Sequence, residues 1–163
     1  MKGCDCMKKL IAMVFVFVCM LSLAACNNAE QEQVTTYSFR GEHEYFAISN
    51  GSIILSDTEE MFDGGDLQIT QSCVFEAVAS YSATFYTLTD GEQRTILSNS
   101  VIDQTGGSVT VDGDLGKASG KGFIIGSKVE NIEELRENLW FELKTTDLDE
   151  NEKIYQIQLT LTD

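Results

Sequence analysis

Aspartates beside glycines are the residues of this chain whose type and spacing best suit metal chemistry. They occur at 63–66 (DGGD) and 112–114 (DGD), and a third acidic group stands at 147–150 (DLDE). Ca²⁺ takes oxygen ligands, which acidic turns can supply, although none of the groups matches the EF-hand loop. Acidic residues with glycine are also ordinary hairpin-turn composition. Calcium is therefore the one cofactor left open, and its candidate ligands are Asp63, Asp66, Asp112 and Asp114.

Residues for nucleophilic or acid–base catalysis are scarce. The single histidine, His43, stands between two glutamates, and no Gly-x-Ser-x-Gly segment is present. A serine or cysteine triad would have to use this histidine, which we expect instead to be a solvated residue at a strand edge. Paired carboxylates could serve a glycosidase, but among 26 acidic residues pairs arise by chance. We expect no catalytic activity.

The N-terminal residues have the pattern of a bacterial lipoprotein signal. Three lysines among the first nine residues precede an apolar run over 10–23, which is shorter than the ~20 residues that a spanning helix needs. The run ends in 23–26 (LAAC). This tetrapeptide, Leu-Ala-Ala-Cys, resembles the lipobox at all four positions, and the resemblance implies lipid on the sulfur of Cys26.

Lipidation would divide the chain into three parts. The resemblance implies cleavage before Cys26 and acyl chains, palmitate among them, that hold the protein at the outer face of the cell membrane. Because each buried methylene contributes about 0.8 kcal/mol, two or more chains anchor a protein stably. We expect a signal helix over 1–25, a lipid-anchored tether over 26–33 and a folded domain over 34–163. A plain secretory signal and an uncleaved single-span anchor remain the alternatives.

Cleavage would leave a strongly acidic domain with one free thiol. Residues 1–25 carry three lysines and one aspartate, so their removal changes the net charge from −15 to −17. Nucleic-acid binding needs basic surface, so we expect no nucleic-acid partner. Cys73 would be the only cysteine besides Cys26, which excludes an intramolecular disulfide. Its neighbours Val74 and Phe75 lead us to expect a small, buried core residue.

Two turn signals predict β-hairpins. Asn50-Gly51 and Asp90-Gly91 both interrupt segments of alternating apolar and polar residues. Such pairs favour the positive φ angles of tight two-residue turns. At the second turn the register stays open, because Phe85 can face either Ile96 or Leu97.

The remaining pattern favours an all-β domain with one helix. Gly64-Gly65 indicates a turn or bulge, and strict alternation over 139–144 and 155–162 predicts two half-buried strands. Asn131 can cap a short helix near 131–138. Short strands separated by frequent turn signals predict an antiparallel β-sandwich of immunoglobulin-like or jelly-roll-like type.

Trp140 is the candidate interaction residue. It falls on the polar side of its predicted strand, together with Glu142 and Lys144. An exposed tryptophan on a sheet face is a typical binding hot spot, and a second apolar layer under the predicted helix is the alternative. We expect a non-enzymatic binding or interaction module facing another envelope protein. A small-ligand or calcium-binding lipoprotein is the alternative function, followed by a carboxylate-based hydrolase.

The body of the chain also resembles, loosely, small lipoproteins of Gram-positive bacteria. The resemblance lies in 39–42 (FRGE), which a strand follows, and in the turn Gly64-Gly65-x-Leu67. It implies a lipid-anchored position on a Gram-positive cell envelope and a β-sandwich. It implies no catalytic activity.

Overall fold

The computed structural model describes residues 34–126 and 131–163. The chain separates into a unit over 1–32 and a compact unit over 33–163. The predicted signal helix, tether and lipidated Cys26 lie outside the described residues. Within the described ranges, no helix is both long and apolar enough to cross a membrane.

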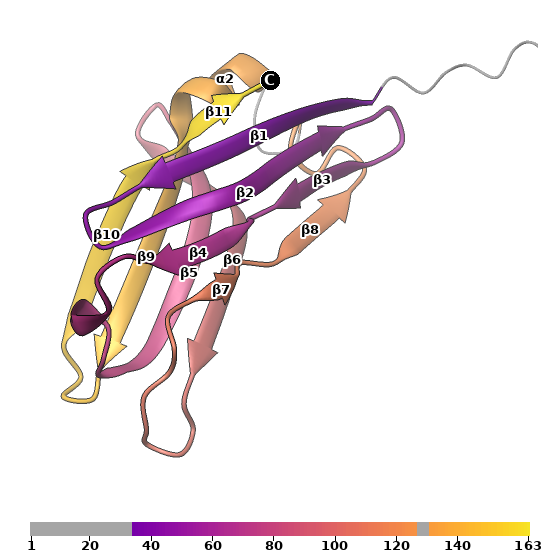
Figure 1. Cartoon of the computed structure of the whole chain (residues 1–163). Helices are drawn as coiled ribbons and strands as arrows, with labels where there is room; N and C mark the ends of the chain where they lie inside the picture. Colours follow the sequence, from indigo (N-terminus) through magenta and orange to yellow (C-terminus); the bar gives the residue numbers. More distant parts are fainter. Residues whose placement is uncertain (1–33, 127–130) are drawn as a thin grey trace, which may run out of the picture. The chain divides into compact units, whose positions relative to one another are not determined.

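Two antiparallel sheets build the described unit (Figure 1). Sheet A contains β1 (Thr35–Glu42), β2 (Phe46–Leu55), β3 (Glu60–Asp63), β4 (Asp66–Ile69), β7 (Gly113–Asp114), β8 (Lys117–Gly120) and β11 (Thr160–Thr162). Sheet B contains β5 (Val78–Thr89), β6 (Glu92–Ile102), β9 (Leu139–Asp147) and β10 (Glu152–Gln158). The short helical elements are η2 (Ser72–Val74) and α2 (Ile132–Asn138). The prediction of a mainly β, antiparallel sandwich with one short helix is confirmed.

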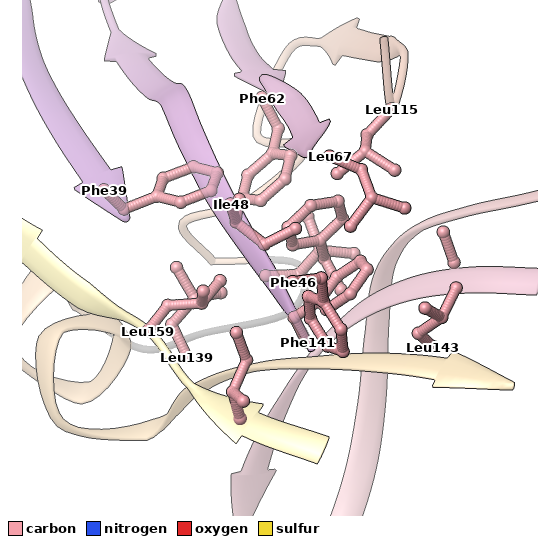
Figure 2. Close-up of a cluster of buried hydrophobic side chains, with 14 of the residues drawn as sticks. Phe39, Phe46, Ile48, Phe62, Leu67, Leu115, Leu139, Phe141, Leu143 and Leu159 are labelled. Atoms are coloured by element: carbon pink, nitrogen blue, oxygen red, sulfur yellow. The ribbon is translucent and has the colours of Figure 1, made fainter. Parts of the chain in front are cut away.

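The core lies between the sheets and is rich in phenylalanine. Phe62 of sheet A meets Phe85 of sheet B with ring centroids 5.1 Å apart, and Phe46 meets Phe141 at 5.9 Å. Figure 2 shows Phe46 and Phe62 of sheet A converging with Phe141 of sheet B. Offset and edge-on ring pairs add stabilisation beyond the burial of apolar area. Because the core side chains all come from residues 39–161, the unit has a hydrophobic core of its own.

Glycines interrupt two strands of sheet A without changing their register. β3 and β4 pair with β2 in one register on both sides of Gly64-Gly65. The backbone ladder continues across the gap, because Gly64 N–H donates to Gly116 O at 2.9 Å and Leu115 N–H donates to Gly65 O at 2.8 Å. Gly65 has φ +71°, and a Cβ there would lie 2.2 Å from a backbone oxygen. The predicted irregularity at Gly64-Gly65 is thus a break within a strand.

The predicted hairpin turn at Asn50-Gly51 is wrong. β2 runs straight through these residues, and the pairing of β1 with β2 shifts by one residue between Phe39 and Gly41. Asn50 has φ +58° at this β-bulge. The dipeptide indicates a positive φ, and this conformation occurs in β-bulges and in tight turns alike.

The predicted hairpin at Asp90-Gly91 is confirmed. These residues join β5 to β6 with φ angles of +52° and +81°, the left-handed pair that a two-residue turn requires. Phe85 faces Leu97, and a register shift follows directly at Tyr86, which faces Thr95. The extra residue, Ile96, is buried, so a bulge settles the register that the sequence left open.

The C-terminal strand closes one side of the sandwich. β10 pairs with β9 in sheet B, and the chain then crosses so that β11 pairs with β1 in sheet A. Leu159 N–H donates to Leu139 O at 2.8 Å at the crossing. Nearby, Asn131 caps α2 by accepting a hydrogen bond from Glu134 N–H at 3.0 Å, and Leu135 packs into the core.

Cys73 is exposed, so the prediction of a buried core thiol is wrong. It lies in the single turn η2, between β4 and β5. Phe75 is buried in its place, with its ring 5.6 Å from that of Tyr155. In one helical turn consecutive residues point in different directions, so apolar sequence neighbours do not imply a shared buried face.

Candidate functional site

Trp140 lies on the face of sheet B that points away from the core. Leu139 and Phe141 on either side of it are fully buried, whereas Trp140 is half-buried. Across the sheet its neighbours in register are Tyr86 on β5 and Gln158 on β10. We call the surface formed by these outward side chains of β5, β6, β9 and β10 the outer face of sheet B.

Polar side chains on the outer face hydrogen-bond to one another across strands. Gln156 Nε2 donates to a carboxylate oxygen of Glu142 at 2.8 Å. The hydroxyls of Thr84 and Ser98 lie 2.9 Å apart. Such pairs fix side-chain rotamers before any partner arrives, which lowers the ordering cost of binding.

Tyr86, which lies beside Trp140 on the neighbouring strand, is almost completely buried. Only 2% of its surface is exposed. Burial raises the pKa of its phenol above the usual 10.0, and the negative charge of Glu142 raises it further. Tyr86 therefore stays protonated and neutral, so the aromatic part of the face carries no charge of its own.

A hollow of about 330 Å³ lies toward the other end of the same face. Hydroxyl groups and an ion pair line it, and the pair joins Lys144 Nζ to Glu152 Oε1 at 2.7 Å. Ile102 also lines it, with 67% of its surface exposed, and Ile154 of β10 is 57% exposed. The face thus offers an aromatic end and a hydroxyl-rich end with apolar side chains nearby.

Three of the four calcium candidates come together around a lysine. Asp63, Asp66 and Asp114 line one small depression with Lys117. Lys117 Nζ lies 2.6 Å from Asp63 Oδ2. Asp112 lies elsewhere, in the lining of a hollow formed with η2 and the 108–111 segment. In residues 34–126 and 131–163, no group of three or more acidic, histidine or cysteine side chains is arranged to hold a metal.

The hydrogen bonds of these aspartates are largely local. Asp63 Oδ1 accepts from Gly65 N–H at 3.0 Å, and Asp66 Oδ2 accepts from the Asn50 amide at 2.8 Å. The pKa of Lys117 is raised by its hydrogen bond and ion pair with Asp63, and then by the charges of Asp114 and Asp66. Lys117 therefore stays positive and offsets part of the charge of the carboxylates that a calcium ion would need.

The third acidic group stabilises a turn. Asp147 Oδ1 accepts hydrogen bonds from the backbone N–H groups of Asp149 and Asn151, both at 2.9 Å. These bonds, with those from the Asn151 side chain, hold the pKa of the Asp147 carboxyl below its usual 3.8. Glu150 takes the positive φ of +65° in the same turn, so local geometry accounts for this acidic group.

His43 packs in an aromatic cluster and is not the solvated residue we expected. Its ring stacks on Phe46 with centroids 4.8 Å apart and lies edge-on to Tyr155 at 5.5 Å. Its Nδ1 accepts a hydrogen bond from Tyr45 N–H at 3.3 Å. The neighbouring glutamates indicated that the histidine side chain is exposed to solvent. This was wrong, because the β1–β2 turn directs the ring back over the sandwich.

Glu60 is a buried carboxylate that the sequence analysis did not single out. It is 8% exposed, and its Oε2 accepts hydrogen bonds from Ile124 N–H at 2.5 Å and Ile125 N–H at 2.9 Å. A signal was present, because period-two alternation puts Glu60 on the same side of β3 as Phe62. The contact fixes the 121–126 loop to sheet A.

Comparison of the chain with protein-family models, with curated proteins and with solved structures finds no match. The residues themselves are therefore the basis for a functional proposal. Among the described features, the outer face of sheet B combines a half-exposed tryptophan with pre-paired polar groups. In the acidic depression, in contrast, Lys117 already pairs with Asp63 and offsets part of the negative charge.

Proposed function

We propose that this chain is a lipoprotein, anchored through Cys26 to the outer face of a bacterial cell membrane, whose β-sandwich is a non-enzymatic binding module. The lipobox-like segment 23–26 and the apolar run before it support the anchor. Lipid must then do the anchoring, because a domain with a net charge of −17 after cleavage is repelled by anionic lipid headgroups.

The observation that carries the binding function is the outward position of Trp140. Tryptophan is enriched among the residues that dominate binding energy at protein interfaces. Trp140 stands between Tyr86 and Gln158 in a row across sheet B, so a partner would meet a rigid aromatic group flanked by a hydrogen-bonding amide.

The outer face fits a protein partner better than a small molecule. Small-ligand sites are concave and enclose most of their ligand, whereas this face belongs to one sheet and its hollow is open to solvent. The acidic charge excludes nucleic acid as a partner. Another protein of the cell envelope is therefore the partner class that we propose.

Site-specific photocrosslinking in intact cells tests this proposal. A photoreactive amino acid at Gln158, beside Trp140, should capture one dominant envelope protein. The same amino acid at Thr36, an exposed residue of β1 in sheet A, is the matched control and should capture far less. Trp140→Ala, combined with the probe at Gln158, should reduce the captured product by about tenfold, as expected for a hot-spot residue.

Equal capture from both probes, or no effect of Trp140→Ala, would overturn the assignment of the outer face. The anchor is tested separately with Cys26→Ala, which should move the protein from the membrane fraction to the medium. Retention of Cys26→Ala as an uncleaved precursor would favour a single-span anchor. If no protein is captured, ligand screening that begins with calcium addresses the alternative function.

A further inference from the structure

A hollow of about 390 Å³ lies among the segments that connect the two sheets. Its lining comes from the end of β4 with η2, from the residues that lead into β5, and from the 108–112 segment. Figure 1 shows the chain between β6 of sheet B and β7 of sheet A, which contains this segment. The hollow has the volume of a small-molecule site, and none of its lining belongs to the outer face of sheet B.

Backbone hydrogen bonds hold the walls of this hollow in place. Val109 N–H donates to Val78 O at 2.7 Å, which ties the 108–112 segment to the start of β5. Phe75 N–H donates to Ser72 O at 2.9 Å and closes the turn of η2. Walls that are fixed before a ligand arrives lower the ordering cost of binding.

One part of the lining is apolar. Phe75 and Val111 line the hollow and belong to the hydrophobic core. Ile69 and Val109 also line it, and both are half-buried and packed against the core. A hydrocarbon group that entered the hollow would lose water from its own surface and from these side chains, which favours binding roughly in proportion to the area covered.

The other part of the lining is negatively charged. Glu76 and Asp112 are exposed side chains of the hollow, and no lysine or arginine lines it. Within residues 34–126 and 131–163, neither carboxylate takes part in an ion pair. Burial raises the pKa of Tyr81 above its usual 10.0, and the charge of Asp112 raises it further. The negative charge of Asp112 therefore acts on neighbouring groups.

Two other hollows that contain carboxylates each include a lysine. In the acidic depression of sheet A, Lys117 Nζ lies 2.6 Å from Asp63 Oδ2. In the hollow on the outer face of sheet B, Lys144 Nζ lies 2.7 Å from Glu152 Oε1. The hollow beside η2 differs from both, because its lining supplies two carboxylates, apolar surface and no cation.

We propose that this hollow binds a small organic cation, an ammonium or guanidinium group carried on a short hydrocarbon stem. Glu76 and Asp112 attract the charge, and the apolar lining contacts the stem. Calcium fits less well, because it takes about six to eight oxygen ligands and the described residues contain no group of three acidic side chains arranged to hold a metal. Since Trp140 lies on a different surface, this site goes beyond the proposed function and does not depend on it.

An NMR titration of the full chain in non-ionic detergent tests the proposal, with 1,5-diaminopentane as the probe. We expect saturable shifts of the backbone amides of Phe75 and of 108–112, with a Kd of about 1 mM or below. Pentane-1,5-diol has the same stem without the charge and should bind at least about tenfold more weakly.

Four variants separate the charge of the hollow from its shape. Glu76→Gln and Asp112→Asn each remove one charge and keep the side-chain shape, so each should weaken binding about threefold or more. Glu92→Gln removes the same charge from an exposed residue outside the hollow and should have less than about a 1.5-fold effect. Ser108→Trp fills the hollow without changing a charge and should weaken binding about tenfold or more.

Diffuse attraction of cations to an acidic chain is the competing explanation. It predicts that Glu92→Gln weakens binding as much as Asp112→Asn does, and that Ser108→Trp has no effect. Either result would overturn the proposal, as would displacement of the diamine by an equal concentration of calcium, or no saturable shift up to about 20 mM diamine. A circular dichroism melt shows whether each variant keeps the fold, and the two charge variants decide the question if Ser108→Trp does not.

Discussion

The buried carboxylate of Glu60 accepts a hydrogen bond at 2.5 Å from the backbone N–H of Ile124, 64 residues further along the chain. The same oxygen accepts from Ile125 N–H at 2.9 Å. We expect Glu60→Ala to lower the free energy of unfolding by about 3 kcal/mol, because two backbone donors lose a charged acceptor. Urea denaturation measures this change.

The neighbouring Glu59 supplies the control for this contact. It is exposed, and its carboxylate accepts a single bond from the Ser119 hydroxyl at 2.7 Å. Glu59→Ala should cost less than about 1 kcal/mol, as expected for an exposed hydrogen bond. Equal losses of unfolding free energy in the two variants would show that the Glu60 contact stabilises the fold no more than an exposed hydrogen bond does.

Thr87 is the site of a predicted gain in stability. Its side chain is fully buried, and among the described residues its hydroxyl has no hydrogen-bond partner. Because desolvating an unpaired hydroxyl is unfavourable, the isosteric change Thr87→Val should raise the free energy of unfolding by about 1 kcal/mol. Thr84→Val, which removes a hydroxyl 2.9 Å from that of Ser98, should bring no gain. A loss of stability in Thr87→Val would point to an additional partner for this hydroxyl.

The contrast between Glu60 and Asn50 shows what sequence could and could not predict. Alternation predicted the strand that became β9, and capping chemistry predicted α2, because these signals are local. The single strand predicted over 155–162 is divided between β10 and β11, which belong to different sheets. Asn50-Gly51 indicated a positive φ, but only the long-range pairing of β1 with β2 determines that this conformation occurs in a β-bulge and not in a hairpin turn. The Glu60 contact depends on a loop 64 residues away, and no local pattern encodes such a separation.

The candidate site also has one feature that the sequence could predict and one that it could not. The outward position of Trp140 follows from the period of one strand. The grouping of Asp63, Asp66 and Asp114 around Lys117 needs the register of β3 with β8 and of β4 with β7. That register brings Asp63 opposite Lys117, 54 positions away along the chain. The sequence therefore indicated the carboxylates but not the lysine that pairs with one of them.

Two glycines should resist substitution for different reasons. Gly91 has φ +81° and open space where a Cβ would stand, so Gly91→Ala should cost about 1 kcal/mol from backbone strain alone. Gly51 has no positive φ, but a Cβ there would lie 2.1 Å from the ring of Phe39. Gly51→Ala should cost about 3 kcal/mol through displacement of that ring. Thermal melts of both variants should preserve this order, and a reversed order would contradict it.

The Asp147 turn predicts a specific dependence of stability on pH. Its folded-state pKa lies below the ordinary value of 3.8 because backbone and side-chain donors of Asn151 stabilise the carboxylate. A lowered pKa contributes stability that is complete above the unfolded value and is lost as the pH falls through the folded value. Asp147→Ala should therefore be less stable than the wild type at pH near 7. The difference should shrink below pH 3.8. Denaturation across this range measures it, and a difference independent of pH would contradict the carboxylate's role.

Lys117 should suppress a response to calcium in the wild type. Its ammonium group stands 2.6 Å from Asp63 Oδ2 and shares a depression with Asp66 and Asp114. Lys117→Gln removes the positive charge and leaves three carboxylates to repel one another. We expect the variant to melt at a lower temperature than the wild type without calcium, and to recover with about 1 mM calcium, within the range that weak extracellular sites use.

Lys121→Gln is the matched control for this prediction, because Lys121 is an exposed lysine just beyond β8. It should change neither the melting temperature nor the calcium response to a comparable degree. A calcium-dependent rise in the melting temperature of the wild type, as large as that of Lys117→Gln, would mean that Lys117 does not compete with the ion. That result would favour the calcium-binding function, because the carboxylates would then bind calcium in the presence of the lysine.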